Sequence, residues 1–193
     1  MNKNNIITCL LTLLALLCPM QGKASYMFKH YGVQNGLSQS TVYAIMQDRT
    51  GFIWIGTKEG LNRFDGTSFK IYRAYNDEHS LQSDFITSLY EDADGNIWVG
   101  TDIGVWIYNP MTDSFRHFNT KTAGGTIITN SVNVITGNNR YIYISANEQG
   151  VFRYDIKERS LTNNPLPGYS NVVGMSLGKD NRIWLGLFGD GLY

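Results

Sequence analysis

The feature that most constrains this chain is a tryptophan segment that recurs along it. The segment reads Gly-Phe-Ile-Trp-Ile-Gly-Thr at residues 51–57, Gly-Asn-Ile-Trp-Val-Gly-Thr at 95–101 and Arg-Ile-Trp-Leu-Gly at 182–186. A diverged copy at residues 140–145 carries Tyr143 in place of the tryptophan. The copies lie about 41 to 45 residues apart, with several short apolar runs in each interval. Such a period is typical of a β-propeller in which each repeat forms one four-stranded blade.

Turn residues divide each copy into strands. In the first copy, residues 42–46 are apolar at consecutive positions, which predicts an inner strand covered on both faces by neighbouring blades. A turn at 48–51, the tryptophan strand, a glycine turn, a third strand at 61–65 and an outer strand at 68–72 follow. We therefore predict an all-β fold with about three and a half four-stranded blades of a truncated, seven-bladed propeller. The partial propeller covers residues 26–193, with blades at about 41–72, 86–118, 132–162 and 172–193.

The aromatic residues and glycines of the repeat are predicted to be structural. A large rigid ring fills the wedge between blades that splay outward, and glycine permits close approach of two backbones or a positive φ angle. The residues assigned this role are Gly51, Trp54, Gly56, Gly60, Gly95, Trp98, Gly100, Gly104, Tyr143, Gly150, Trp184, Gly186 and Gly191.

The amino-terminal segment differs in composition from the repeats. Residues 1–5 carry the single charge of Lys3, an apolar run follows at 6–18, and Gly-Lys-Ala at 22–24 precedes Ser25. This pattern predicts a secretory signal peptide at residues 1–24, and the apolar run is shorter than the about 20 residues of a membrane-spanning helix. The alternative of a lipoprotein would use Cys18, but Leu17 stands where a small residue is required. Cys9 and Cys18 both lie in this segment, so disulfides and thiolate metal sites are not expected after its removal.

Composition argues against several classes of function. Without Lys3 and Lys23, 14 basic side chains remain against 16 acidic ones, and no basic run suits a nucleic acid, so no nucleic acid contact is expected. The three histidines, His30, His79 and His117, are isolated in the sequence and no metal motif accompanies them. Residues 92–96 resemble a calcium loop superficially, but they lack the later acidic ligand. We expect no catalytic residues, no metal and no cofactor in this segment.

The repeat resembles the two-component regulator propeller family. The resemblance rests on Asp48-x-x-Gly51-x-Ile53-Trp54-Ile55-Gly56-Thr57-x-x-Gly60-Leu61-x-x-Phe64-Asp65, on the second copy at 92–109 and on the lead-in Asn-Gly-Leu-Ser-Gln-Ser at 35–40. It implies the periplasmic sensor region of a hybrid two-component histidine kinase, which is anchored in the inner membrane and dimeric when full length. It also implies a second propeller, an immunoglobulin-like connector, a membrane helix, a kinase, a receiver and a helix-turn-helix output domain, which act in a phosphorelay.

Three classes of function remain open, because propellers serve as sensors, enzymes and scaffolds. The first is a sensor that binds an oligosaccharide and signals across the membrane to regulate transcription. The second is a secreted interaction scaffold. The third is a carbohydrate-active enzyme, but the sialidase box places its aspartate five residues before the tryptophan, whereas Asp48 and Asp92 lie six before Trp54 and Trp98.

Candidate ligand-binding residues lie in two sets of connections that propellers present on one face. The turns between second and third strands supply the first set, and the connection at residues 73–84 supplies the second. Trp106 is added because other copies have Asn62 and Phe152 at its position. The candidates are Lys58, Glu59, Tyr75, His79, Asp102, Trp106, Asn147 and Glu148.

The sequence stops within the third strand of its fourth repeat, which predicts an amino-terminal fragment. A seven-bladed ring with about 44 residues in each blade needs about 310 residues. Residues 26–31 are expected to belong to the final blade of that ring, so the rest of the propeller is an expected partner. The open faces of the first and last blades favour association.

Overall fold

The computed structural model describes residues 27–75, 77–164 and 171–193. The predicted signal peptide at 1–24 and Asn76 lie outside the described residues. Tyr31–Tyr193 form one compact unit, and residues 27–30 belong to a separate amino-terminal unit. No helix in the described ranges is long and apolar enough to cross a membrane.

In the described part of the chain, 15 strands form four antiparallel sheets, which we call blades 1 to 4 in chain order. Blade 1 holds β1 (Val42–Gln47), β2 (Ile53–Thr57), β3 (Gly60–Phe64) and β4 (Phe69–Tyr72), and blade 2 holds β5 (Ile86–Glu91), β6 (Ile97–Thr101), β7 (Gly104–Asn109) and β8 (Ser114–His117). Blade 3 holds β9 (Val132–Gly137), β10 (Tyr141–Ala146), β11 (Gly150–Asp155) and β12 (Ser160–Asn164), and blade 4 holds β13 (Val172–Leu177), β14 (Ile183–Leu187) and β15 (Gly191–Leu192).

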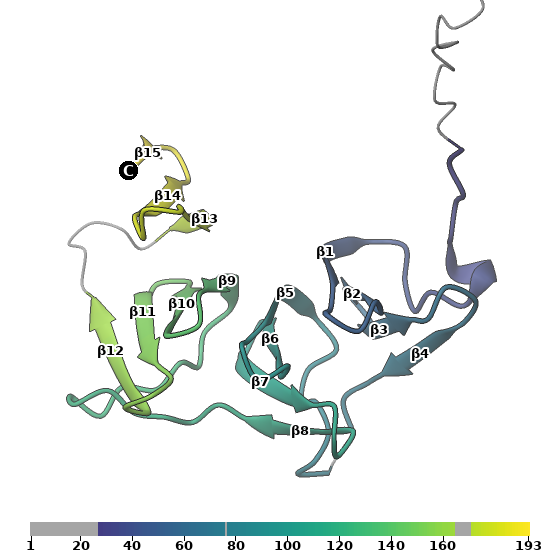
Figure 1. The fold of residues 1–193 in the computed structure, drawn as a ribbon, viewed down its shortest axis with the longest axis horizontal. Helices are drawn as coiled ribbons and strands as arrows, with labels where there is room; N and C mark the ends of the chain where they lie inside the picture. Colours follow the sequence, from purple (N-terminus) through teal and green to yellow (C-terminus); the bar gives the residue numbers. More distant parts are fainter. Residues whose placement is uncertain (1–26, 76, 165–170) are drawn as a thin grey trace, which may run out of the picture. The chain divides into compact units, whose positions relative to one another are not determined.

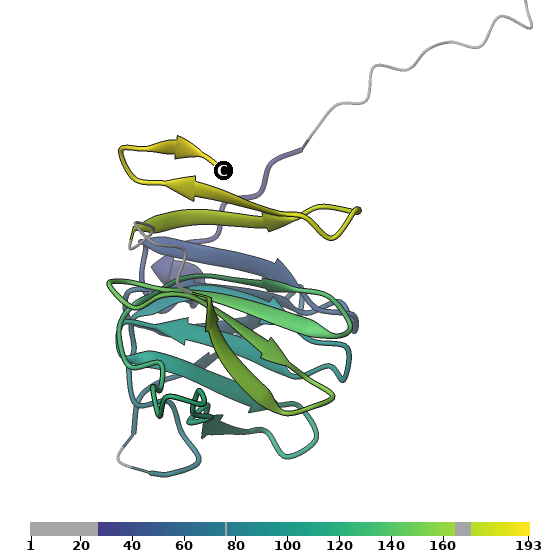
Figure 2. The same ribbon diagram turned by 90° about the vertical axis from the view of Figure 1, so that its left-hand side faces the viewer.

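Each blade is a simple meander, since consecutive strands are hydrogen-bonded neighbours. The first strands of successive blades lie side by side, and β4, β8 and β12 lie outermost (Figure 1). Figure 2 shows β13, β14 and β15 as a meander that continues the succession of sheets. The prediction of an all-β propeller fold is confirmed, and one 3-10 turn (η1, Val33–Asn35) precedes the first blade among the described residues.

The core lies between neighbouring blades, because each sheet presents one face to the next. Trp54 is 1 % exposed and Trp98 is 2 % exposed. The Trp54 ring packs on Tyr108 of blade 2, with ring centroids 5.0 Å apart, and the Trp98 ring packs in the same way on Tyr154 of blade 3 at 5.6 Å. Trp184 of blade 4 is 46 % exposed.

Glycine permits the closest approach between blades. A Cβ atom on Gly56 would lie 2.7 Å from Cγ2 of Ile86, the first residue of β5. A Cβ atom on Gly100 would lie 2.8 Å from Cγ1 of Val132, the first residue of β9. Any side chain at either glycine would therefore push the next blade away.

The prediction that residues 42–46 are covered on both faces is wrong. Val42 is 45 %, Tyr43 50 % and Ile45 71 % exposed. β5 packs against β1 on the side of blade 2, but in the described structure no blade covers the opposite face of β1. The run of apolar residues predicts the inner strand of a blade. The exposure of that strand depends on whether another blade packs against each of its faces.

Candidate functional site

The turns between second and third strands hold five of the predicted ligand residues on the surface. The threonine that ends each second strand shapes the turns of blades 1 and 2, since Thr57 Oγ1 donates to the Gly60 carbonyl at 2.9 Å and Thr101 Oγ1 to that of Gly104 at 3.0 Å. Gly60 and Gly104 have φ angles of 118° and 117°, which favour glycine. The exposed residues in these turns are Lys58, Glu59, Asp102, Asn147 and Glu148.

The connection at residues 73–84 lies against the outer strand of blade 2. The Phe115 amide of β8 donates to the His79 carbonyl at 2.8 Å, and Ala74 and Leu81 form a parallel bridge within the connection. The Leu81 side chain is fully buried and anchors the connection to the core between blades 1 and 2. Tyr75 and His79 point into solvent.

A hollow of about 350 Å³ lies between this connection and blade 2. It is lined by Asp77, Glu78, Gln82, Trp106 and His117. Of the predicted ligand residues, only Trp106 lines this hollow, and the turn residues between second and third strands do not. His117 was recognised in the sequence as an isolated histidine, but its position opposite Trp106 in the β7–β8 pair became visible only in the structure.

Trp106 forms a wall of the hollow instead of an exposed platform. It is 4 % exposed and its ring centroid lies 4.7 Å from that of His117. The equivalent residues Asn62 and Phe152 are fully buried, so the slot faces the core in all three copies. A ligand in this hollow would meet Trp106 beside His117.

The polar groups of the hollow are suited to hydrogen bonding. Desolvation lowers the pKa of His117 and so favours the neutral imidazole, which offers one donor and one acceptor. Asp77 and Glu78 supply exposed carboxylates and Gln82 an amide. The Gln82 amide donates to the Tyr75 carbonyl at 3.3 Å and to the Asp77 carbonyl at 2.8 Å, which leaves its oxygen as an acceptor for a hydroxyl.

The segment that resembles a calcium loop has another role in the structure. Asp92 is 6 % exposed, and its carboxylate accepts hydrogen bonds from the Asp94 amide, the Asn96 amide and the Trp98 indole. These donors fix the turn and the tryptophan together. In the described ranges, no group of three or more histidine, cysteine or acidic side chains is arranged to hold a metal ion.

The hydrogen bond between the aspartate and the tryptophan of a repeat was not predicted from the sequence. Asp48 Oδ2 accepts from Trp54 Nε1 at 2.7 Å, and Asp92 Oδ2 accepts from Trp98 Nε1 at 2.9 Å. The signal that could have indicated this hydrogen bond is the spacing of six residues between aspartate and tryptophan, which the first two copies share. Blade 3 departs from it, because Asn138 stands five residues before Tyr143.

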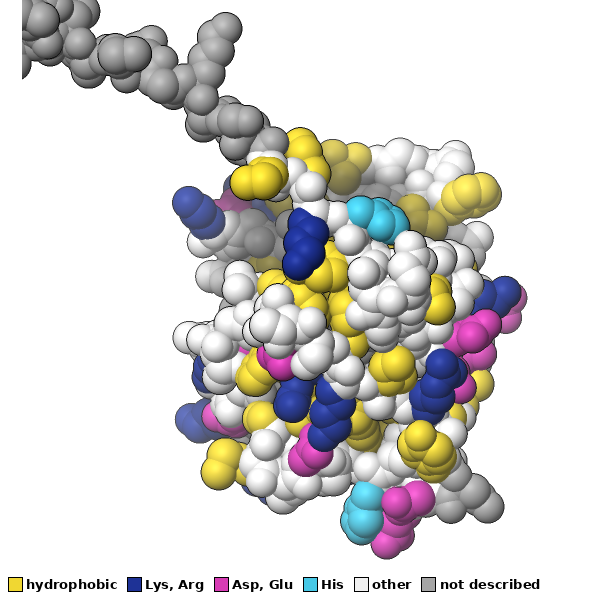
Figure 3. All heavy atoms as spheres, turned by 90° about the vertical axis from the view of Figure 1, so that its right-hand side faces the viewer, with side chains coloured by type: hydrophobic (Ala, Val, Ile, Leu, Met, Phe, Trp, Pro, Cys, Tyr) yellow, Lys and Arg dark blue, Asp and Glu magenta, His cyan; other side chains and the backbone are white. Residues whose placement is uncertain are grey.

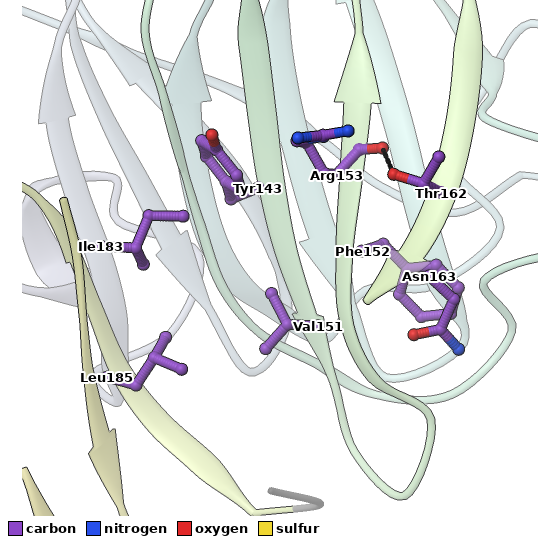
Figure 4. A pocket seen from close by; sticks show the side chains of 8 residues that line it. All are labelled: Tyr143, Val151, Phe152, Arg153, Thr162, Asn163, Ile183 and Leu185. Atoms are coloured by element: carbon purple, nitrogen blue, oxygen red, sulfur yellow. Dashed lines mark hydrogen bonds between the residues drawn. The ribbon is translucent and has the colours of Figure 1, made fainter. Parts of the chain in front are cut away.

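A second hollow, of about 370 Å³, lies between blades 3 and 4 (Figure 4). Ile183 and Leu185 of β14 lie on one side of it, and Tyr143 and Val151 lie on the other. Tyr143 takes the position that a tryptophan fills at the other two junctions. The smaller ring contributes to the gap at this junction.

One face of the molecule carries both basic and acidic side chains. Figure 3 shows lysine and arginine side chains interspersed with acidic ones on the face nearest blade 1. Arg49 illustrates the pattern, since its guanidinium bonds to Glu91 at 2.6 Å and to the carbonyls of Asp92 and Ala93 in the next blade.

Two of the repeats match a known protein family. A model of the two-component regulator propeller matches residues 36–59 and 80–102, which contain the tryptophan strand of blade 1 and that of blade 2. Histidine kinase P4 of Formosa agariphila is 51 % identical over 49 residues, which make up 25 % of this chain and 4 % of that protein.

Solved structures extend the likeness to most of the chain. The extracellular domain of a hybrid two-component system of B. thetaiotaomicron superposes with a TM-score of 0.78 at 27 % identity, over 87 % of this chain and 25 % of that one. A second such extracellular domain from the same organism gives a TM-score of 0.68 at 23 % identity, over 79 % of this chain and 23 % of that one, which shows the shared fold. This chain therefore spans about a quarter of each of these two solved domains.

Proposed function

Because this chain carries two-component regulator propeller repeats, we propose that it is a sensing segment of a hybrid two-component histidine kinase and lies outside the cytoplasm. The observation that carries the proposal is the match of 87 % of the chain to the extracellular domain of such a system. In this proposal the sensor is periplasmic, anchored in the inner membrane and dimeric when complete. Ligand binding acts by shifting the arrangement of its domains, and the segment itself performs no chemistry.

We propose an oligosaccharide as the ligand and the hollow beneath residues 73–84 as its site. A saccharide presents hydroxyl groups in fixed directions, and recognition requires a few planar polar groups beside an aromatic wall. Gln82, His117 and the two carboxylates supply the polar groups, and Trp106 supplies the wall. The nearly balanced charge of the chain suits a neutral sugar.

Calorimetric titration of the complete extracytoplasmic region with a panel of oligosaccharides tests this proposal. His117→Ala and Gln82→Ala should each weaken binding about tenfold, which corresponds to about 1.4 kcal/mol. Asn147→Ala, in an exposed turn that does not line the hollow, is the matched control and should bind as the wild type does.

The same samples distinguish the alternative functions. Analysis of the sugars after incubation should show them unchanged, whereas turnover would favour a carbohydrate-active enzyme. Failure to bind any member of a broad panel would refute the oligosaccharide proposal and favour an interaction scaffold. Binding that depends on Asn147 but is insensitive to His117 would place the site at the turns between second and third strands.

A further inference from the structure

A hollow of about 290 Å³ lies at the junction of blades 1 and 2. The turn between β1 and β2 and the turn between β5 and β6 border it, and Phe52, Ile97 and Pro110 give it apolar walls. Both blades that form it are complete four-stranded sheets, and their facing sides pack on each other. Its volume is close to the lower end of ligand pockets, which is about 300 Å³, so it suits a small molecule.

Arg63 lies in this hollow at a position where the repeat does not need a charge. It is partly buried and opposes Trp54 in the pairing of β2 with β3. Ile107 opposes Trp98 in the same way in blade 2, where it is 1 % exposed and belongs to the apolar core. An apolar side chain therefore closes the equivalent slot at the junction of blades 2 and 3.

The contacts of Arg63 fix its guanidinium in place. The central carbon of the guanidinium lies 4.7 Å from the centroid of the Phe52 ring. Nη1 donates to the Tyr108 hydroxyl at 3.2 Å, and that hydroxyl donates to Asp113 Oδ1 at 2.8 Å. The cation is thus held between an aromatic ring of blade 1 and a hydrogen-bonded phenol of blade 2.

Most of the donors of Arg63 remain available. A guanidinium carries five N–H donors. Among the described residues, the Tyr108 hydroxyl is the only hydrogen-bond acceptor for them, and no described carboxylate forms an ion pair with Arg63. A charge that is partly removed from water gains most from an anionic partner that also accepts hydrogen bonds.

The other charges of the hollow are paired, bonded or exposed. Arg49 and Glu91 neutralise each other across a distance of 2.6 Å. The carboxylate of Asp48 accepts from the amides of its own turn and from the Trp54 indole. Asp94 opposes an anionic ligand, but it is exposed, so solvent and salt screen its charge.

We propose that this hollow binds a small organic acid with an apolar body. The carboxylate pairs with Arg63, whose planar fork suits the two oxygens of a carboxylate, and the apolar body lies against Phe52 and Pro110. This inference goes beyond the sensing function. It depends neither on an oligosaccharide ligand nor on the hollow beneath residues 73–84.

A pair of ligands with the same shape tests the charge requirement. The complete extracytoplasmic region is titrated in a calorimeter with 3-phenylpropanoate and with its neutral amide, 3-phenylpropanamide. The acid should bind at least about tenfold more tightly, because only the acid offers a charge to Arg63. This comparison uses the wild type alone, so it does not depend on the folding of any variant.

Substitutions then locate the site. Arg63→Gln should weaken binding of the acid at least about tenfold, and Arg63→Lys, which keeps the charge but lacks the fork, should weaken it less. Asp94→Asn should bind the acid as tightly as the wild type or more tightly, because it removes an opposing charge. Arg116→Gln is the matched control, since Arg116 is exposed on β8 and does not line the hollow, and its affinity should be unchanged.

Four results would each overturn the proposal. They are a wild type that does not bind the acid, equal affinity for the acid and the amide, wild-type affinity in a folded Arg63→Gln variant, and weaker binding in Asp94→Asn. The last result would mean that the hollow holds a cationic group instead of an anionic one. Equal midpoints of urea denaturation for Arg63→Gln and the wild type would show that the variant is folded.

Discussion

At the scale of single residues, the aspartate six residues before Trp54 has two tasks. Asp48 Oδ1 accepts from the Thr50 amide, the Thr50 hydroxyl and the Phe52 amide, which closes the turn. Oδ2 accepts from the buried indole of Trp54. Burial raises the pKa of Asp48, but these hydrogen bonds outweigh it and leave the pKa below its usual value.

Replacement of this aspartate by asparagine tests the two tasks together. An asparagine offers one acceptor oxygen, so Asp48→Asn leaves either the turn amides or the Trp54 indole without an acceptor. We expect the free energy of unfolding to fall by about 1–3 kcal/mol, as measured by urea denaturation. Asp94→Asn is the control, because Asp94 is an exposed carboxylate in the corresponding turn of blade 2, and its stability should match the wild type. Equal stability of Asp48→Asn and wild type would show that the indole bond contributes nothing.

The sequence predicted which residues repeat, but it left open what each repeat residue contacts. The spacing of Asp48 and Trp54 is visible in the sequence, whereas the bond between them requires the curvature of the turn. Trp106 shows a second limit of prediction from the sequence. Its rarity at that position made it a candidate ligand residue, and the structure shows that the third strand turns this slot toward the core in blades 1, 2 and 3.

At the scale of strands, an ionic and phenolic cluster ties the outer strand of blade 1 to blade 2. Asp113, in the turn between β7 and β8, accepts from Tyr72 at 3.0 Å and from Tyr108 at 2.8 Å through Oδ1. Lys70 of β4 bonds to its Oδ2 at 2.5 Å. Burial raises the pKa of Asp113, but the three donors prevail and lower it to about 2.

This cluster predicts a dependence of stability on acid. A carboxyl group whose pKa is lower in the folded state stabilises the fold above its unfolded value of 3.8, and this contribution is lost as the pH falls toward about 2. The Asp113 side chain is 50 % exposed, so solvent screening limits the contribution to about 1 kcal/mol. Thermal unfolding between about pH 5 and pH 2 should therefore show a smaller loss of Tm for Asp113→Asn than for the wild type.

Asp77→Asn is the matched control for this pH series. Asp77 is an exposed carboxylate on the connection at 73–84, and its variant should keep the wild-type slope. Parallel slopes for Asp113→Asn and the wild type would show that the cluster holds no proton-linked stability.

Strand positions were predictable because turns and apolar runs recur with the repeat. The strands of blade 2, for example, follow those of blade 1 at the same spacing. The exposure of β1 was not predictable from the sequence. Residues 42–46 indicate an inner strand, but they do not show whether a neighbouring blade covers each of its faces. The path of residues 73–84 was equally hidden, because it depends on Leu81 entering the core and on the His79 carbonyl pairing with β8.

At the scale of the whole molecule, the three junctions between blades are not equal. Blades 1 and 2, and blades 2 and 3, enclose large clusters built around Trp54 and Trp98. The described cluster between blades 3 and 4 is smaller and consists of Val151, Val172, Leu185 and Leu187, with Met175 and Ile183 partly buried against it. The hollow beside Tyr143 lies at this junction. Blade 4 is therefore the part of the described fold that should separate first.

Hydrogen exchange can measure this order of opening. Amides of β13 and β14 should exchange at least about tenfold faster than those of β6 and β10, which corresponds to about 1.4 kcal/mol in opening free energy. Tyr143→Trp adds a larger ring beside the hollow and should slow exchange in β13 and β14, because it adds contacts with Ile183 and Leu185. Tyr75→Trp, at a position 64 % exposed on the connection at 73–84, is the control and should leave their exchange unchanged. Uniform exchange across the four blades would mean that the chain opens as one cooperative unit, and the difference between junctions would then have no energetic consequence.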